Sequence, residues 1–213
     1  ITTTRDGNTI ANTVATGPVT ITPDPQQTPA DPPPNAPPPR GSAALGQVPG
    51  QFGVLPDLSE ETSNGAIPRK STTGQSPFAA YSRPATLGAA ADGPKIAIIA
   101  TGLGINEQGS LDAIDTLPDD VTLAFAPYGR SLGATVASAR TAGHEIMLEI
   151  PLEPFDFPQN DPGPHTMLTG DAPRANLEKL FWLMARFGGY FSVINNMGAR
   201  FTASATDFAP IME

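Results

Sequence analysis

Short apolar runs alternate with stretches of helical spacing through the second half of this 213-residue chain. The runs are rich in Ile, Val and Leu, and the stretches between them place apolar side chains three or four positions apart. Because strands joined by helical crossovers run parallel, the pattern predicts an α/β fold, as an open parallel sheet or a (β/α) barrel. We expect strands at residues 95–100, 121–125, 146–150 and 190–194, and helices at residues 106–116, 131–142 and 171–187.

Local signals refine these boundaries. Gly143 stands where a left-handed C-terminal helix cap belongs, and Asp171 is expected to cap the last helix, with Pro173 in its first turn. The first two strands are near-continuous apolar runs, so we expect them to be buried on both faces. In the third strand, apolar residues alternate with Glu145, Met147 and Glu149, and a long loop is expected over residues 151–171.

Proline and aromatic residues are unevenly divided along the chain. Before Lys95 lie 16 of the 25 prolines but only 3 of the 14 Phe, Tyr and Trp residues. A Pro-rich stretch with few apolar residues cannot offset its ordering entropy, which predicts disorder with polyproline II segments. We therefore expect a disordered Pro-rich linker over residues 1–66, a segment leading into the domain over residues 67–94, and the folded domain over residues 95–213.

Composition excludes several classes of protein. There is no apolar stretch of about 18–20 residues that could span a membrane. The chain has no Cys and 2 His, which removes thiol catalysis, disulfide scaffolds, iron–sulfur clusters and sites built on three histidines. The net charge is −9, of which −7 falls in residues 95–213, so a nucleic-acid partner is not expected.

Two carboxylates mark the end of the third expected strand. In both architectures the chemistry lies at the carboxyl ends of the strands. Glu149 and Glu153 lie there, where a carboxylate could act as a general acid or base or bind a divalent metal. Glu149 either points into a cavity or belongs to a solvated rim, and both interpretations stay open. For Glu153, Asp156 and Asp161 the solvated rim is favoured.

Polar residues also follow the first and fourth strands. Thr101 and Gly102 come after the first, and Asn195, Asn196 and Arg200 come at the end of the fourth. Their amide and hydroxyl groups could hydrogen-bond sugar hydroxyls or an acyl group, although Asn is also common in loops for its turn geometry.

Other candidate residues have simpler interpretations. Gly102 and Gly104 would begin a dinucleotide-binding motif, but the third glycine is replaced by Glu107, and a tight turn explains the pair as well. His144, His165 and Trp182 are expected to be structural, and Trp182 and the Phe residues of its helix are expected in the core.

Several segments in order resemble a known family. KIAIIATGLGIN, LPDDVTLAFAPYG, ARTAGHEIMLEIPLEPFDFP, DPGPHTMLT and NNMGARFTA, between Lys95 and Thr202, are similar to the divergent polysaccharide deacetylases, bacterial envelope proteins related to the NodB-type carbohydrate esterases. The segment IPRKSTTGQSPFAAYSRP resembles the part that precedes the domain in this family.

The resemblance implies a NodB-like distorted (β/α) barrel in the periplasm, joined by the Pro-rich spacer to an inner-membrane anchor outside this chain. It implies an envelope polysaccharide or peptidoglycan as partner. The chemistry of the relatives is metal-assisted removal of an N- or O-acyl group, in which a metal polarises the carbonyl and an activated water attacks it.

The chain departs from the family pattern at three positions. Thr101-Gly102 stands where many members have an Asp pair, Glu149 replaces a His, and Asn196 replaces another His. These positions cannot assemble the usual His/Asp metal site, so no metal ligand is assigned, and zinc is expected only if other residues rebuild the site. Three functions follow as hypotheses: a deacetylase, a catalytically inactive relative that binds envelope glycan or a partner protein, and, on the two glycines alone, a nucleotide-binding oxidoreductase.

Length adds a further expectation. A barrel of this class needs about 200 residues, whereas residues 95–213 supply 119. We therefore expect about the N-terminal half of a barrel, in a chain truncated at both ends. An unpaired strand edge would make such a half-barrel prone to association.

Overall fold

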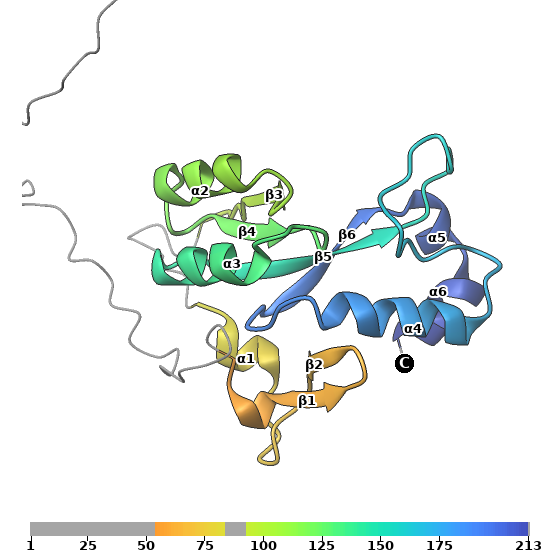
Figure 1. Ribbon diagram of the computed structural model, residues 1–213, viewed down its shortest axis with the longest axis horizontal. Coiled ribbons are helices and arrows are strands. Elements are labelled where there is room, and N and C mark those ends of the chain that lie inside the picture. Colours follow the sequence, from red (N-terminus) through yellow and green to blue (C-terminus); the bar gives the residue numbers. More distant parts are fainter. Residues whose placement is uncertain (1–53, 84–92, 213) are drawn as a thin grey trace, which may run out of the picture. The chain divides into compact units, whose positions relative to one another are not determined.

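The computed structural model describes residues 54–83 and 93–212 (Figure 1). All of them belong to one compact unit that spans residues 39–213. Of the linker expected over residues 1–66, residues 1–53 lie outside the described ranges. The helices and strands are, in chain order, η1 (Pro56–Leu58, a 3-10 helix), β1 (Ser59–Thr62), β2 (Gly65–Pro68), α1 (Pro77–Tyr81), β3 (Ile99–Leu103), α2 (Glu107–Thr116), β4 (Thr122–Phe125), α3 (Leu132–Thr141), β5 (Ile146–Leu152), α4 (Pro173–Met184), β6 (Ser192–Met197), α5 (Ala199–Ala203) and α6 (Ala205–Met212).

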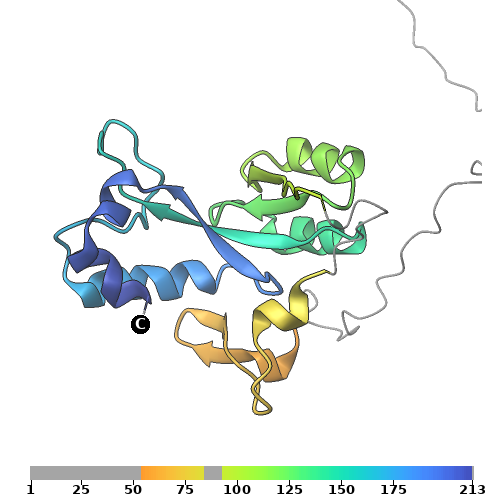
Figure 2. The same ribbon diagram turned by 180° about the vertical axis from the view of Figure 1, so that it is seen from behind.

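A four-stranded parallel sheet forms the centre of the domain, in the order β3-β4-β5-β6. Helices α2, α3 and α4 connect its successive strands, as Figure 2 also shows from behind. Both features confirm the predicted α/β fold with parallel strands. The core lies between the sheet and these helices, with Phe125 of β4, Leu148 of β5, Val136 of α3 and Leu183 of α4 fully buried in it.

The first strand differs from its prediction. It begins at Ile99 rather than Lys95, and Ile96 is 90% exposed, so the expectation of a strand buried on both faces is wrong. The physical reason is its place at the edge of the described sheet, with β4 on one side. The second strand, β4, is buried along its length as expected.

The third strand is more buried than its alternating pattern predicted. Every residue of β5 is buried, because the strand lies between β4 and β6. Glu149, which alternation placed on a separate polar face, is 2% exposed. The strand also extends past the expected end to Leu152, which pairs with Met167 of the following loop.

Helix boundaries follow the local signals except at one cap. Gly143 has φ +98°, as a left-handed cap requires, and Pro173 opens α4. Asp171, however, is not the cap of α4: that position is Ala172, and the Asp171 carboxylate is 2.8 Å from the Lys179 amine instead. Phe181, expected in the core, is 40% exposed.

The segment before the sheet is ordered earlier than predicted. Residues 54–66, assigned to the linker, form η1 and most of the β1–β2 hairpin. Two apolar side chains, Val54 and Leu58, are buried here, and the Tyr81 hydroxyl accepts a hydrogen bond from the Leu55 amide at 2.8 Å. The Asn64-Gly65 pair, a common hairpin signal, could have located this turn in the sequence.

None of the helices in the described part of the chain is long and apolar enough to cross a membrane.

Candidate functional site

The carboxylate of Glu149, in the middle of β5, connects this strand to the carboxyl-terminal parts of β3 and β6. One oxygen accepts a hydrogen bond from the Gly102 amide, next to the end of β3, and the other accepts from the Asn196 side-chain amide of β6 at 2.9 Å. Glu149 itself lies on β5, so β4 stands between it and Gly102. Glu149 is 2% exposed, which excludes the solvated rim, one of the two interpretations that the sequence left open for this residue.

An irregularity in the β3–β4 ladder leaves the Gly102 amide free to donate to Glu149. Ala100 pairs with Leu123 and Leu103 pairs with Phe125, so β3 contains one residue more than β4 over this stretch. Such a bulge frees a backbone N–H from the ladder. Gly102 adopts φ +78°, a conformation that glycine takes without a steric cost.

Small side chains on β4 let the Glu149 side chain reach across. The register pairs Ala124 with Met147, so Ala124 and Ala126 lie on the same face of the sheet as Glu149. Both alanines are buried, and a methyl group leaves room above it for a longer neighbouring side chain. The sequence contains no periodic signal for this arrangement, because it depends on the register between strands.

The asparagines of β6 have separate roles. Asn196 is committed to Glu149, whereas Asn195 is exposed and its amide donates to the Met197 carbonyl at 2.7 Å. Met197 has φ +57°, which is uncommon for a residue with a side chain and is found more often at functional sites than elsewhere. Thr101 is exposed at the end of β3. Thr101 and Asn195 are therefore both exposed, but the register pairs Asn195 with Ile150, so Asn195 lies on the opposite face of the sheet from Glu149.

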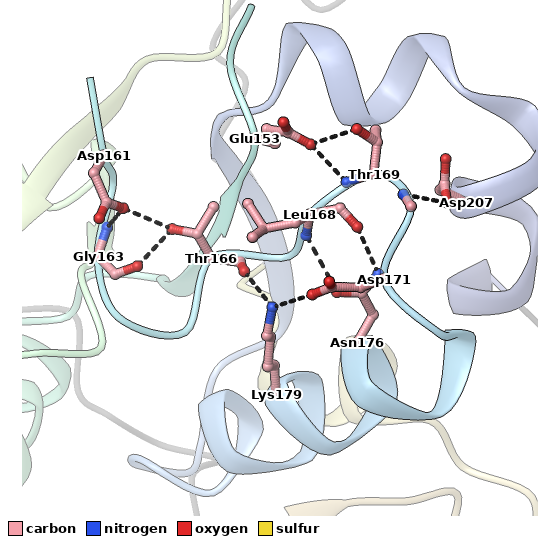
Figure 3. A network of polar contacts seen from close by, with 11 residues as sticks. Glu153, Asp161, Gly163, Thr166, Leu168, Thr169, Asp171, Asn176, Lys179 and Asp207 are labelled. Carbon is pink, nitrogen blue, oxygen red and sulfur yellow. Dashed lines mark hydrogen bonds and ion pairs between the residues drawn. The ribbon is translucent and has the colours of Figure 1, made fainter. Parts of the chain in front are cut away.

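Glu153 belongs to a second, separate group. It is 5% exposed, so the favoured solvated rim is wrong for this residue. One oxygen accepts from both the amide and the hydroxyl of Thr169, at 2.5 and 2.6 Å (Figure 3). The other oxygen is 3.2 Å from the Arg200 guanidinium. Arg200, expected to contact substrate, is thus paired with Glu153, and its amide also donates to the Glu153 carbonyl.

A polar network fixes the loop that carries Thr169 (Figure 3). The Asn176 side chain of α4 donates to the Leu168 carbonyl at 2.9 Å and accepts from the Leu168 amide at 3.2 Å. The Lys179 amine donates to the Thr166 carbonyl at 2.9 Å, and Asp207 of α6 accepts from the Gly170 amide at 3.0 Å. Sequence reasoning missed these residues, although a buried Asn within an apolar helix stripe is a usable signal.

Gly104, Gly129 and His144 have structural roles. A Cβ on Gly104 would lie 2.6 Å from Leu132, and one on Gly129 would overlap the Gly104 carbonyl, so the turn needs glycine for close packing. Both ring nitrogens of His144 lie within hydrogen-bond distance of backbone carbonyls, those of Val121 and Ile114. The structural interpretation of His144 is confirmed.

The zinc implied by the resemblance can be compared with these donors. A zinc site takes three or four N, O or S ligands. Two buried carboxylates lie on or just after β5: Glu149, whose two oxygens face N–H donors, and Glu153, which is engaged by Thr169 and Arg200. No group of three or more His, Asp or Glu side chains within residues 54–83 and 93–212 is arranged to hold a metal ion. These residues do not fit a zinc site of the usual kind.

Comparison with known proteins gives two matches. The family model described as "Divergent polysaccharide deacetylase" matches residues 98–213. The crystal structure of an uncharacterized protein from Agrobacterium tumefaciens C58 is similar, with a TM-score of 0.64 and 40% sequence identity. The match covers 70% of this chain and 59% of that one, so this chain spans less than two thirds of its length. No curated protein matches the chain.

Proposed function

Because the chain belongs to the divergent polysaccharide deacetylase family, we propose that it binds an envelope polysaccharide at the carboxyl ends of β3, β5 and β6. The observation that carries the proposal is the Glu149 carboxylate, held between the Gly102 amide and Asn196, with Thr101 exposed on β3 and Asn195 exposed on the opposite face of β6. Exposed hydroxyl and amide groups are suited to the hydroxyls and acylamino groups of a sugar. In this proposal Glu149 is a positioning residue that keeps the strand ends in register.

Hydrolysis of an acyl group from that polysaccharide is the second candidate function, and the family match favours it. Here Glu149 would act as a general base toward water. At 2% exposure it would first have to release Gly102 or Asn196, because a base needs access to the proton that it takes. That requirement is why binding is the first proposal and deacylation the second.

The setting proposed for this function extends beyond the described residues. The four-stranded sheet would form part of a NodB-like distorted barrel, and the Pro-rich stretch before it would be a spacer. The domain would then work in the periplasm, tethered to the inner membrane by an anchor outside this chain. The two edge strands of the described sheet, with Ile99 exposed on β3 and Val193 exposed on β6, are compatible with further chain or a partner completing the barrel.

Retention on immobilised peptidoglycan and on N-acetylated chitooligosaccharide tests the binding proposal. We expect the full chain to be retained, and a Thr101→Val, Asn195→Ala double variant to elute early. Asn64→Ala, an exposed asparagine in the β1–β2 turn, is the matched control and should be retained like the wild type. Equal retention of the double variant would exclude a site at these strand ends.

Acetate release from the same ligands, with and without added zinc, tests deacylation separately. Release by the wild type that is lost in a folded Glu149→Gln variant would support hydrolysis by this carboxylate. Retention without any acetate release would leave binding as the function.

A further inference from the structure

An aromatic stack ties the loop after β5 to helix α4. The His165 ring lies 3.5 Å from the Trp182 ring, centroid to centroid, with an angle of 3° between the two planes. The Tyr128 ring follows on from His165 at 6.4 Å, and the Tyr128 hydroxyl accepts a hydrogen bond from the His165 amide at 3.2 Å. His165 therefore joins the loop to the end of β4 and to α4 at once.

The stack favours a neutral imidazole. His165 Nδ1 is buried and has no hydrogen-bond partner among the described residues. Protonation of Nδ1 would create a charged N–H donor with no acceptor among the described residues, and an unsatisfied buried donor costs free energy. A cation could gain from lying against the indole, but the Arg186 guanidinium already lies 4.7 Å from the centre of that ring.

The charged groups around His165 also favour the neutral imidazole. Burial lowers the pKa of His165, and the positive charges of Arg186 and Lys179 on α4 lower it further. The nearby acids are already engaged: Asp171 pairs with Lys179, and Asp161 accepts from the Gly163 amide at 2.9 Å. Tyr128, the titratable group just after β4, is a neutral phenol near pH 7, and burial raises the pKa of its hydroxyl further.

The same loop supports the end of β5. Two residues after His165, the Met167 amide donates to the Pro151 carbonyl and the Met167 carbonyl accepts from the Glu153 amide, both at 3.1 Å. Thr169 then supplies both donors to one oxygen of the Glu153 carboxylate. These hydrogen bonds connect the loop that carries His165 to the end of the strand that carries Glu149.

We propose that His165 is a pH-sensitive latch: neutral, it holds residues 161–170 against Trp182, and protonated, it releases them and loosens the carboxyl end of β5. The device lies outside the proposed binding residues and does not depend on the ligand. It would make the strand-end site responsive to mild acid.

Trp182 is the only tryptophan in the chain, so its fluorescence reports on the stack directly. We expect one titration step in the emission of the wild type, with a midpoint below the 6.5 of a free imidazole. The step should be absent in His165→Gln. Arg186→Gln removes one positive charge near the His165 imidazole. It should therefore move the midpoint of the titration upward, toward 6.5.

Hydrogen exchange tests the release itself, after correction for the intrinsic pH dependence of exchange. Below the midpoint the amides of Met167 and Thr169 should lose protection, while that of Leu123 in the β4–β5 ladder should keep it. If His165→Gln does not fold, NMR titration of the imidazole in the wild type gives the midpoint. A fluorescence step that persists without His165, an imidazole that titrates at or above 6.5, or unchanged loop protection would each overturn the latch.

Discussion

Glu149 and Gly102 lie on strands that are not neighbours, yet the carboxylate of Glu149 accepts a hydrogen bond from the Gly102 amide across β4. The contact needs a bulge in β3, alanines on β4 and a long acidic side chain on β5. It holds one edge strand of the described sheet to the centre, and through Asn196 the same carboxylate holds the other edge.

Removing the charge of Glu149 should destabilise the domain. In Glu149→Gln the single remaining oxygen can serve one of the two donors, and the new amide group must face the other. We expect a loss of about 1–3 kcal/mol, the cost of an unsatisfied buried donor, measured by urea unfolding. Glu178→Gln makes the same chemical change in an exposed ion pair, and we expect a change of less than about 0.5 kcal/mol. Equal effects of the two would contradict the role of Glu149.

A Cβ at Gly102 should destabilise the domain through the backbone conformation and not through a clash. An alanine there meets no atom within 4 Å, but φ +78° costs an L-residue about 1–2 kcal/mol. Gly74→Ala is a matched control, with φ +88° and equally open space. Gly102→Ala should lose more, because it also disturbs the Glu149 contact. In a double-mutant cycle with Glu149→Gln the losses should be less than additive, and full additivity would argue against coupling.

Loss of Glu153 should destabilise the domain more than loss of its ion-pair partner Arg200. Glu153→Ala strands the Thr169 amide and leaves Arg200 unpaired, so we expect a loss of about 3 kcal/mol. Arg200→Ala should cost about 1 kcal/mol or less, because the Arg200 side chain is 49% exposed. Thermal unfolding of both variants measures the difference, and a reversed order would mean that the ion pair dominates.

Alanine substitutions of Gly163 and Gly170, in the loop after β5, should distinguish the effect of a packing clash from that of backbone strain. A Cβ on Gly163 would overlap the Tyr128 ring, whereas one on Gly170 would meet nothing within 4 Å, and both have positive φ. Gly163→Ala should therefore shift the emission of Trp182, because Tyr128 lies against the His165 stack. Gly170→Ala should leave the emission unchanged. An identical spectrum for Gly163→Ala would contradict the packing of this loop.

The depressed pKa of His165 also has a consequence for stability. The unfolded chain takes up the proton at a higher pH than the folded chain does, so the contribution of His165 is complete above about pH 6.5. It is lost as the pH falls from there through the folded pKa. Urea unfolding at pH 7 and pH 5 should show a steeper loss in the wild type than in His165→Gln. Parallel losses would mean that other groups cause the acid sensitivity.

Much of the fold could be predicted from the chain, because helix and strand periods are local properties. Gly143 and Pro173 marked helix ends correctly, since a positive φ and a missing amide are requirements of single residues. The hairpin before the sheet was missed, because the Pro-rich composition around it outweighed the Asn64-Gly65 signal. Of the site, Gly102, Glu149 and Asn196 were predicted near one another, but Thr169 and Asn176 were not.

The sequence by itself determined the alternation of strands and helices and the parallel sheet that follows from it. Tertiary structure decided which strands lie at an edge and which carboxylates are buried: Ile96 is exposed, although its run looked like a buried strand, and Glu149 is enclosed, although its neighbours looked like a polar face. The physical reason is that burial of a side chain depends on what packs against it from distant parts of the chain. That is set by strand order and register, neither of which a local pattern contains.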